Sequence, residues 1–204
     1  MSTPSPVVIT GAVEGALDEA VLTRLVNQLG GTLGVVYGRN GKSTVLRRLR
    51  GYNQAARFSP WVVLIDLDED AQCAPPYRAA LLPHTASLMC FRIAVREIEA
   101  WLLADRGRLG EFLGVAASRV PDHPETIQDP KRTMVDLARR SRRRDIREDM
   151  VPRPGSGREV GPAYTSRLIE FVADSPRGWR PEVAARSSNS LERCLACLRR
   201  LTRG

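Results

Sequence analysis

A chain of 204 residues, 43% of them hydrophobic, is long enough to bury about 70% of its unfolded surface in one core. It has no apolar run that could span a bilayer and no basic-then-apolar N-terminal signal, so we expect a soluble cytoplasmic protein without a membrane partner. Its four cysteines are too few to form a disulfide framework at this length.

The first half of the chain alternates apolar runs with amphipathic segments. The apolar runs, which we expect to be strands, are residues 6–13, 32–37, 61–66 and 87–95. Helices are expected from about Leu17, over 43–56, from Pro75 and Pro76, and over 96–105. This β-α-β alternation predicts an α/β fold, a Rossmann-like parallel four-stranded sheet flanked by helices with right-handed crossovers.

The second half of the chain is predicted to be mostly helical. Asp129 and Pro130 are a suitable N-cap and first residue for a helix that continues to about Arg144. Residues 151–162 are rich in glycine and proline and are expected to form a loop, followed by helices near 163–173 and 189–202. We therefore expect an α/β core at 1–105 and a helical extension at 106–204 packed on that core.

Three acids follow the predicted strands. Glu14 closes the first apolar run, and Asp66 and Asp68 close the third. Open α/β sheets bind their ligands at the C-terminal ends of their strands, and clustered carboxylates repel one another unless a cation lies among them. These residues therefore predict a site for Mg²⁺ or Mn²⁺, which prefer oxygen ligands. The alternative is that they are a helix-capping acid and loop acids.

The chain carries 31 lysines and arginines against 23 acids, a net charge of +8, and only two of its basic residues are lysines. Arginines concentrate at 139–147 and again at Arg47, Arg48 and Arg50. Arginine clusters attract phosphate, so we expect the chain to contact nucleic acid through this longer run and Lys42. The alternatives are a GC-rich genome and a solvated helix face. The predicted contacts are Arg139, Arg140, Arg142, Arg143 and Arg144.

Two further motifs have simpler interpretations. The segment VVYGRNGKST resembles a phosphate-binding P-loop, but the position five residues before Gly41 is Val36 rather than glycine. A tight turn that brings Lys42 to the rim of the sheet is the favoured interpretation.

Cys194 and Cys197 form a C-x-x-C pair on the apolar stripe of a predicted helix, which favours core cysteines over a metal or redox pair. The two histidines, His84 and His123, are expected at the surface.

A family resemblance rests on these motifs. The V-E-G-x-x-D-E segment at residues 13–19, followed by the D-x-D of Asp66 and Asp68, resembles the Toprim domain of topoisomerases, primases and OLD-type (overcoming lysogenization defect) nucleases. The aspartate four residues after Glu14, the segment from Arg96 to Asp105 and the D-P-K at 129–131 are similar to small standalone members of the OLD-type branch. The resemblance covers about residues 6–105.

The resemblance implies a metal-dependent nuclease. Glu14 would be a metal ligand or general acid/base, Asp66 and Asp68 would bind Mg²⁺ or Mn²⁺, and Asp18 would assist at a second metal. Asp70 is a further candidate ligand, and Glu99 would complete or orient the site. Two metals about 4 Å apart would activate water and stabilise the leaving oxygen, while Lys42, Lys131 or an arginine would neutralise the phosphate. A partner ATPase is also implied.

Two other functions remain open from the sequence. One is a nucleic-acid-binding or regulatory module that keeps the fold but has lost turnover. The other is a nucleotide-handling enzyme that uses the GRNGKS loop, which would require ATP binding that survives mutation of Asp66 and Asp68.

Overall fold

In the computed structural model, which describes residues 5–203, the chain forms two compact units. The first unit comprises residues 5–94 and 192–203, and the second comprises residues 95–191. This division differs from the expected one at residue 105, because the chain leaves the first unit after Ala94 and returns to it within its last helix. Within residues 5–203, no helix has both the length and the apolar character needed to cross a membrane.

The first unit is built on a parallel sheet, as predicted. Within the described residues its four strands are β1 (Val8–Val13), β2 (Thr32–Gly38), β3 (Trp61–Asp66) and β4 (Met89–Ala94). They are arranged in the order β2-β1-β3-β4, and every neighbouring pair is parallel. The central strands β1 and β3 are mostly apolar, as expected for parallel strands that helices cover on both faces.

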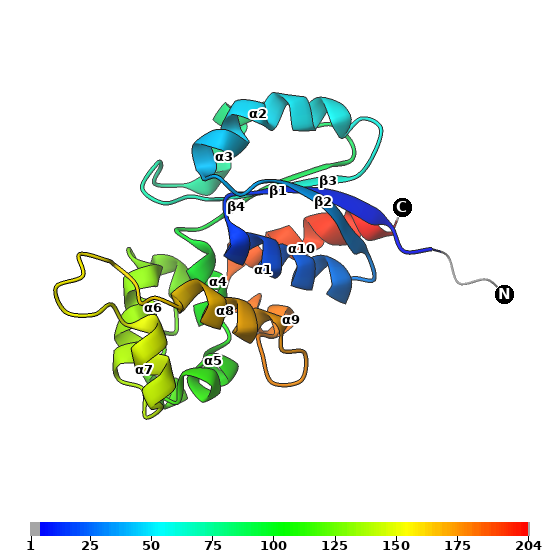
Figure 1. Ribbon diagram of the computed structural model, residues 1–204. Helices are drawn as coiled ribbons and strands as arrows, with labels where there is room; N and C mark the ends of the chain where they lie inside the picture. Colours follow the sequence, from blue (N-terminus) through cyan, green and yellow to red (C-terminus); the bar gives the residue numbers. More distant parts are fainter. Residues whose placement is uncertain (1–4, 204) are drawn as a thin grey trace. The chain divides into compact units, whose positions relative to one another are not determined.

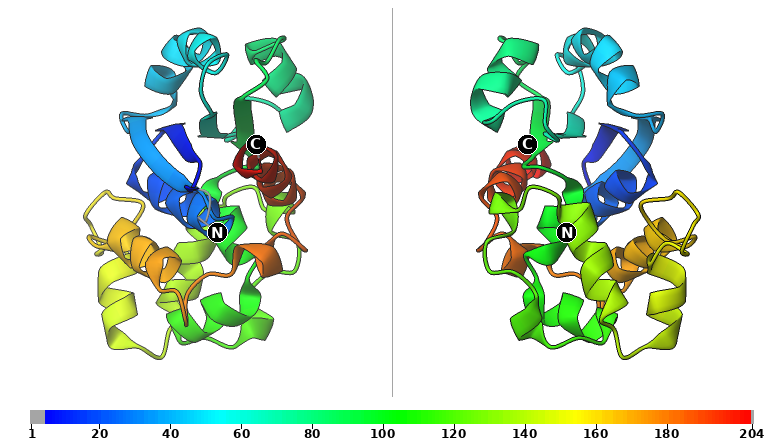
Figure 2. Two further views of the ribbon diagram at one scale, coloured as in Figure 1. Left: turned by 90° about the vertical axis from the view of Figure 1, so that its right-hand side faces the viewer. Right: turned by 90° about the vertical axis from the view of Figure 1, so that its left-hand side faces the viewer.

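Helices cover the two faces of this sheet, as Figures 1 and 2 show. The helices are α1 (Ala16–Gln28), α2 (Lys42–Ala55), α3 (Ala74–Leu81) and α10 (Asn189–Thr202), the last belonging to this unit from Glu192 onward. The helices α2 and α3 lie on one face, and α1 and α10 lie on the other. Their apolar sides bury residues such as Leu22, Leu25 and Val45 against the strands. The fold class expected from the sequence is thus confirmed.

The strand order defines where a ligand site belongs. From β1 the chain moves to β2 on one side, and from β2 it crosses to β3 on the other side of β1. In open α/β sheets this reversal leaves a crevice beyond the C-terminal ends of the two strands on either side of it. The residues that follow β1 and β3 therefore occupy the position at which such folds bind their ligands.

The second unit is helical. Its helices are α4 (Ile98–Leu103), α5 (Arg106–Leu113), α6 (Pro130–Arg139), α7 (Arg144–Met150), α8 (Tyr164–Ala173) and α9 (Pro181–Ala184), with 3₁₀ turns η1 (Ala117–Arg119) and η2 (Pro124–Thr126). Two fully buried indoles anchor its core. Trp179 Nε1 donates to the carbonyl of Trp101 at 3.1 Å, and Trp101 Nε1 donates to Ser190 Oγ at 2.7 Å.

The helix expected to continue to about Arg144 instead ends at Arg139. The buried Ser141 hydroxyl donates to the carbonyl of Leu113 and accepts from the amide of Arg143 at 2.9 Å. A serine that bonds to nearby backbone competes with helical hydrogen bonding, so the chain turns and a separate helix, α7, begins at Arg144. The arginine run is consequently divided between the end of α6, a turn and the start of α7.

Candidate functional site

Glu14 and Asp66 meet at the C-terminal edge of the sheet, as the sequence predicted. Each residue ends or follows one of two adjacent parallel strands. Glu14 Oε1 accepts a hydrogen bond from the amide of Asp66 at 2.9 Å. Burial raises the pKa of Glu14, against the opposing effects of this amide and the nearby Lys42 ammonium. The Glu14 carboxylate thus joins the ends of the two strands and is poised to hold a proton more readily than an ordinary glutamate.

Lys42 occupies the centre of the acidic group. Its Nζ lies 2.5 Å from Asp68 Oδ2 and 2.7 Å from Asp70 Oδ2. The lysine side chain is only 14% exposed, whereas the two carboxylates are 45% and 42% exposed. Burial opposes the charged form, but the bonds to Asp68 and Asp70 raise the pKa of Lys42 above its ordinary value. The lysine is therefore a charged, partly buried cation, and the carboxylates that hold it are more exposed to solvent.

The loop before α2 explains why Lys42 reaches this position. It turns through three residues with positive φ, Gly38 at 91°, Arg39 at 64° and Gly41 at 83°. A Cβ at Gly38 would lie 2.2 Å from the carbonyl oxygen of Val13, so only glycine fits there. The amide of Gly41 donates to the carbonyl of Glu14 at 3.0 Å. This loop docks on the end of β1, and the first residue of α2 then points its side chain at the acids.

Asp70 has a second partner besides Lys42, because it accepts a hydrogen bond from the hydroxyl of Tyr77 at 3.0 Å. Asp18, a further predicted ligand, is buried in the first turn of α1. The bond from Lys42 lowers the pKa of Asp70 against a smaller opposing effect of burial, and the bond from Tyr77 adds a still smaller decrease. The sequence analysis did not identify Tyr77, which follows Pro75 and Pro76 in α3 and carries no motif of its own. Arg39 pairs with Glu19 at 2.6 Å on the rim.

The carboxylates are arranged around the ammonium. In residues 5–203 no group of three or more histidine, cysteine or acidic side chains has the positions needed to hold a metal ion. Mg²⁺ is commonly held by one or two protein carboxylates, with water and substrate phosphates completing its six ligands. Asp68 and Asp70 offer carboxylate oxygens, the kind of ligand that Mg²⁺ and Mn²⁺ take, and the Lys42 ammonium lies between them.

Two predicted residues, Glu99 and Lys131, belong to the second unit. The Glu97 carboxylate accepts from Lys131 Nζ at 2.9 Å and from the Lys131 amide at 3.0 Å. Glu99 is 3% exposed, and its Oε1 accepts from the hydroxyl of Tyr164 at 3.1 Å. Burial raises the pKa of Glu99, and burial together with Glu99 raises the pKa of Tyr164. Glu97 was missed by the sequence analysis, although the E-x-E of Glu97 and Glu99 was a signal.

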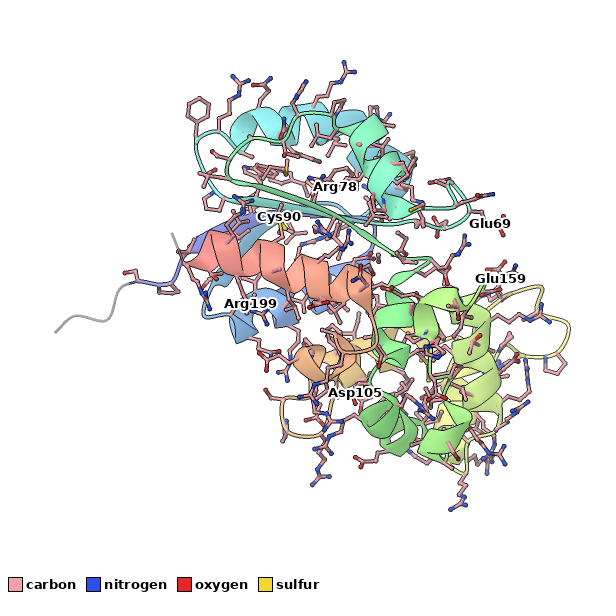
Figure 3. The ribbon with its side chains drawn as sticks, turned by 180° about the vertical axis from the view of Figure 1, so that it is seen from behind. Glu69, Arg78, Cys90, Asp105, Glu159 and Arg199 are labelled. Carbon is pink, nitrogen blue, oxygen red and sulfur yellow. The ribbon has the colours of Figure 1, made fainter. Side chains whose placement is uncertain are left out.

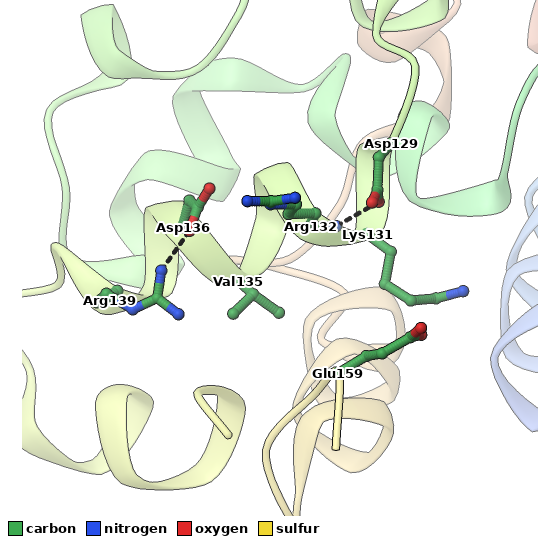
Figure 4. Close-up of a pocket in the computed structure, with 7 residues that line it drawn as sticks. All are labelled: Asp129, Lys131, Arg132, Val135, Asp136, Arg139 and Glu159. Atoms are coloured by element: carbon green, nitrogen blue, oxygen red, sulfur yellow. Dashed lines mark hydrogen bonds and ion pairs between the residues drawn. The ribbon is translucent and has the colours of Figure 1, made fainter. Parts of the chain in front are cut away.

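A pocket of about 300 Å³ opens beside Lys131 along α6. Figure 4 shows the side chains around it, with the bonds from Arg132 to Asp129 and from Arg139 to Asp136 marked. The residues that line it are Asp129, Lys131, Arg132, Val135, Asp136, Arg139 and Glu159. Cations and acids thus alternate on its wall, and the wall includes one residue of the 151–162 loop.

The arginines predicted to bind nucleic acid are exposed in the second unit, but acids neutralise several of them. Arg139 pairs with Asp136, Arg143 with Asp145 at 2.6 Å and Arg144 with Glu148 at 2.7 Å. Such pairs reduce the positive potential that a polyanion would meet. The predicted contacts that are exposed are Arg139, Arg140, Arg142, Arg143 and Arg144. The two histidines, His84 and His123, are also exposed.

Comparisons with known proteins found no relative of this chain. No protein-family model matches the chain, no curated protein matches it, and no solved structure matches it. The function must therefore be argued from the site itself.

Proposed function

We propose that this protein is a Mg²⁺- or Mn²⁺-dependent phosphodiester hydrolase that acts on nucleic acid. The observation that carries the proposal is the Lys42 ammonium held between Asp68 and Asp70 beyond the end of β3. It marks a place where solvent-facing carboxylates bind a cation at the crevice of the sheet. The motif resemblance to OLD-type Toprim nucleases supports the same chemistry and adds a partner ATPase to the proposal.

The residues around this place have distinct roles in the proposal. Asp68 and Asp70 would hold the metal, and Asp66 would join them as a ligand. When bound, the metal supplies an activated water and a stabilised leaving oxygen. Glu14, whose burial raises its pKa, exchanges protons with the water or with the leaving oxygen as general acid/base. The ammonium of Lys42, displaced from Asp68 and Asp70, neutralises charge on the phosphate.

The second unit contributes binding rather than bond cleavage. Its exposed arginines and the partly exposed Lys131 offer positive charge to the backbone of a nucleic acid. Their contacts would be with phosphate rather than with base edges, so the proposed binding is independent of sequence.

A cleavage assay tests the proposal directly. The full chain is incubated with a panel of single- and double-stranded DNA and RNA, with Mg²⁺, with Mn²⁺ and with a chelator. Metal-dependent cleavage is expected, and Asp68→Asn should reduce its rate by at least about 100-fold, the usual scale for loss of an electrostatic catalytic group. The matched control is Glu69→Gln, which removes the same charge from an exposed neighbour in the same loop (Figure 3) and should retain the parent rate.

Cleavage that persists in the chelator, or that Asp68→Asn and Glu69→Gln reduce equally, would contradict the proposed site. Cleavage by neither the parent nor any variant, with nucleic acid still bound, would favour the second candidate. That candidate is a binding or regulatory module without turnover. The same lysine favours it, because its ammonium already neutralises Asp68 and Asp70.

A further inference from the structure

Three of the four cysteines gather between β4 and α10 in the first unit. Cys90 lies on β4, and Cys194 and Cys197 lie one turn apart on α10. All three are free thiols; Cys90 and Cys194 are fully buried, whereas Cys197 is partly exposed. Figure 3 shows Cys90 beside α10. Cys90 and Cys197 lie close enough across the two elements for each thiol to shift the pKa of the other.

Two arginines surround the Cys90–Cys197 pair. Arg92 follows Cys90 by two residues on β4, so both side chains point to the same face of the strand. Its Nε is buried and has no hydrogen-bond partner among the described residues. Arg200 lies one turn after Cys197 on α10, bonds to that thiol and donates to the carbonyls of Ser87 and Met89, the latter at 3.1 Å. Arg200 therefore fastens α10 to the start of β4.

These surroundings give the three thiols different pKa values. The hydrogen bond from Cys90 lowers the pKa of Cys197, with burial opposing it and with Arg200 and Arg92 adding to the decrease. Burial raises the pKa of both Cys90 and Cys194. The thiolate is the reactive form of cysteine, and here it belongs to the thiol that solvent can reach. The buried Cys90 remains a thiol in contact with it.

We propose that Cys197 is a site of peroxide oxidation and that Cys90 converts the oxidised residue into a Cys90–Cys197 disulfide. In the first step the Cys197 thiolate attacks hydrogen peroxide; an S–O bond forms, the O–O bond breaks, and sulfenic acid and hydroxide result. In the second step Cys90 sulfur attacks the sulfenic sulfur, its proton passes to the leaving oxygen, and a disulfide and water form. The two thiols are oxidised by two electrons, and the peroxide is reduced. Neither step depends on the proposed hydrolysis.

The disulfide would close a loop that contains the whole second unit. Cys90 lies shortly before the chain leaves the first unit at Ala94, and Cys197 lies shortly after it returns at Glu192. The bond would therefore fix the last helix of the first unit to the sheet covalently. Oxidation would stabilise that attachment without adding a contact to the acidic group around Lys42.

The test is peroxide treatment of the full chain, followed by digestion without reductant and mass spectrometry. A cross-linked peptide pair containing Cys90 and Cys197, lighter than the two free peptides by two hydrogen atoms, is expected. In Cys90→Ser the sulfenic acid should persist and react with dimedone at Cys197, whereas Cys197→Ser should give neither product. The matched control Cys194→Ser, which changes the other cysteine of α10, should form the same disulfide as the parent.

A second measurement separates a reactive site from a core cysteine. Alkylation of Cys197 by iodoacetamide should keep its rate down to about pH 7 in the folded chain. In the urea-unfolded chain the rate should fall about tenfold per pH unit below the ordinary thiol pKa. A Cys194–Cys197 bond, oxidation of the exposed Cys73 ahead of Cys197, or equal pH profiles in the folded and unfolded chains would each overturn the proposal.

Discussion

Each of the two units contains one of the chain's two lysines, and in each unit carboxylates hold that lysine. In the first unit the Lys42 side chain is 14% exposed, and its partners Asp68 and Asp70 are 45% and 42% exposed. In the second unit the exposures are reversed, because Lys131 is 38% exposed and Glu97 is 16% exposed. The lysine–carboxylate pairs of the two units therefore differ in which charge is exposed. The negative charge is the more exposed one in the first unit, and the positive charge is the more exposed one in the second.

This reversal matters because an ion pair can bind a ligand only through the partner that is exposed to solvent. Outward carboxylates suit a metal ion, and an outward ammonium suits a phosphate. In the proposed function the metal and the reacting phosphate accordingly bind in the first unit, and the second unit contacts the rest of the nucleic-acid backbone.

The largest effect on binding is expected from the arginines of the second unit. Replacing Arg142, Arg143 and Arg144 with alanine should weaken nucleic-acid binding about 10- to 100-fold at 0.1 M salt and flatten its salt dependence, because fewer counterions are released. Fluorescence anisotropy across a salt series measures both quantities. The matched control replaces Arg47, Arg48 and Arg50, three exposed arginines of α2 in the first unit, and should change the affinity less. If the first variant binds nucleic acid as tightly as the parent, the arginines at 139–147 are only a solvated surface.

The next effect concerns metal affinity in the first unit. Lys42→Met removes the cation that competes for Asp68 and Asp70, so Mn²⁺ affinity measured by calorimetry should rise about tenfold, or about 1.4 kcal/mol. Cleavage should nevertheless decrease, because the phosphate loses its neutralising ammonium. The control Lys131→Met makes the same change in the second unit and should leave Mn²⁺ affinity as it was. An unchanged affinity in Lys42→Met would show that the two aspartates do not bind the metal.

The smallest effect is on stability and involves Glu99. Burial raises its pKa, so the folded state holds this proton above pH 4.5, where the unfolded chain has lost it. The free energy of unfolding therefore decreases as pH rises through this region. Glu99→Gln removes the penalty while keeping an acceptor for Tyr164, and it should raise the Tm at pH 7 by about 2–4 °C. The gain should disappear as the pH falls towards 4.5.

Glu97→Gln provides the contrast for that experiment. It weakens the two bonds that Glu97 makes to Lys131, so the Tm at pH 7 should fall rather than rise. Thermal unfolding followed by circular dichroism at several pH values would measure both variants. If both substitutions shift the Tm in the same direction, the prediction that the Glu99 charge destabilises the fold while the Glu97 charge stabilises it is wrong.

The sequence predicted the parts of this molecule that depend on local pattern. Continuous apolar runs located the strands of the sheet, and the acids that follow them converge because parallel strands share one C-terminal edge. The meeting of Glu14 with Asp66 follows from that rule alone.

The contacts that the sequence could not reveal are long-range and depend on loop conformation. Lys42 meets Asp68 and Asp70 across 26 and 28 residues, and the left-handed φ of Arg39 and Asp68 shapes the loops that allow it. Neither residue is a glycine that would have signalled such a turn. Similarly, the start of α10 is capped by the Glu125 carboxylate, which accepts from the amide and hydroxyl of Ser190. No local motif connects Glu125 to that helix.

The return of the chain through α10 has a consequence for synthesis on the ribosome. The strands are complete at Ala94, but α10, one of the two helices on one face of the sheet, emerges only about 100 residues later, which takes about 5–20 s at ordinary elongation rates. During that interval the apolar surface that α10 later buries, around Cys90, is exposed to water and to other nascent chains. The second unit closes on itself only when Ser190 bonds to the amide of Val95 and the indole of Trp101. Both units thus await the same final stretch of chain, and a ribosome-bound fragment that ends before it should need a chaperone.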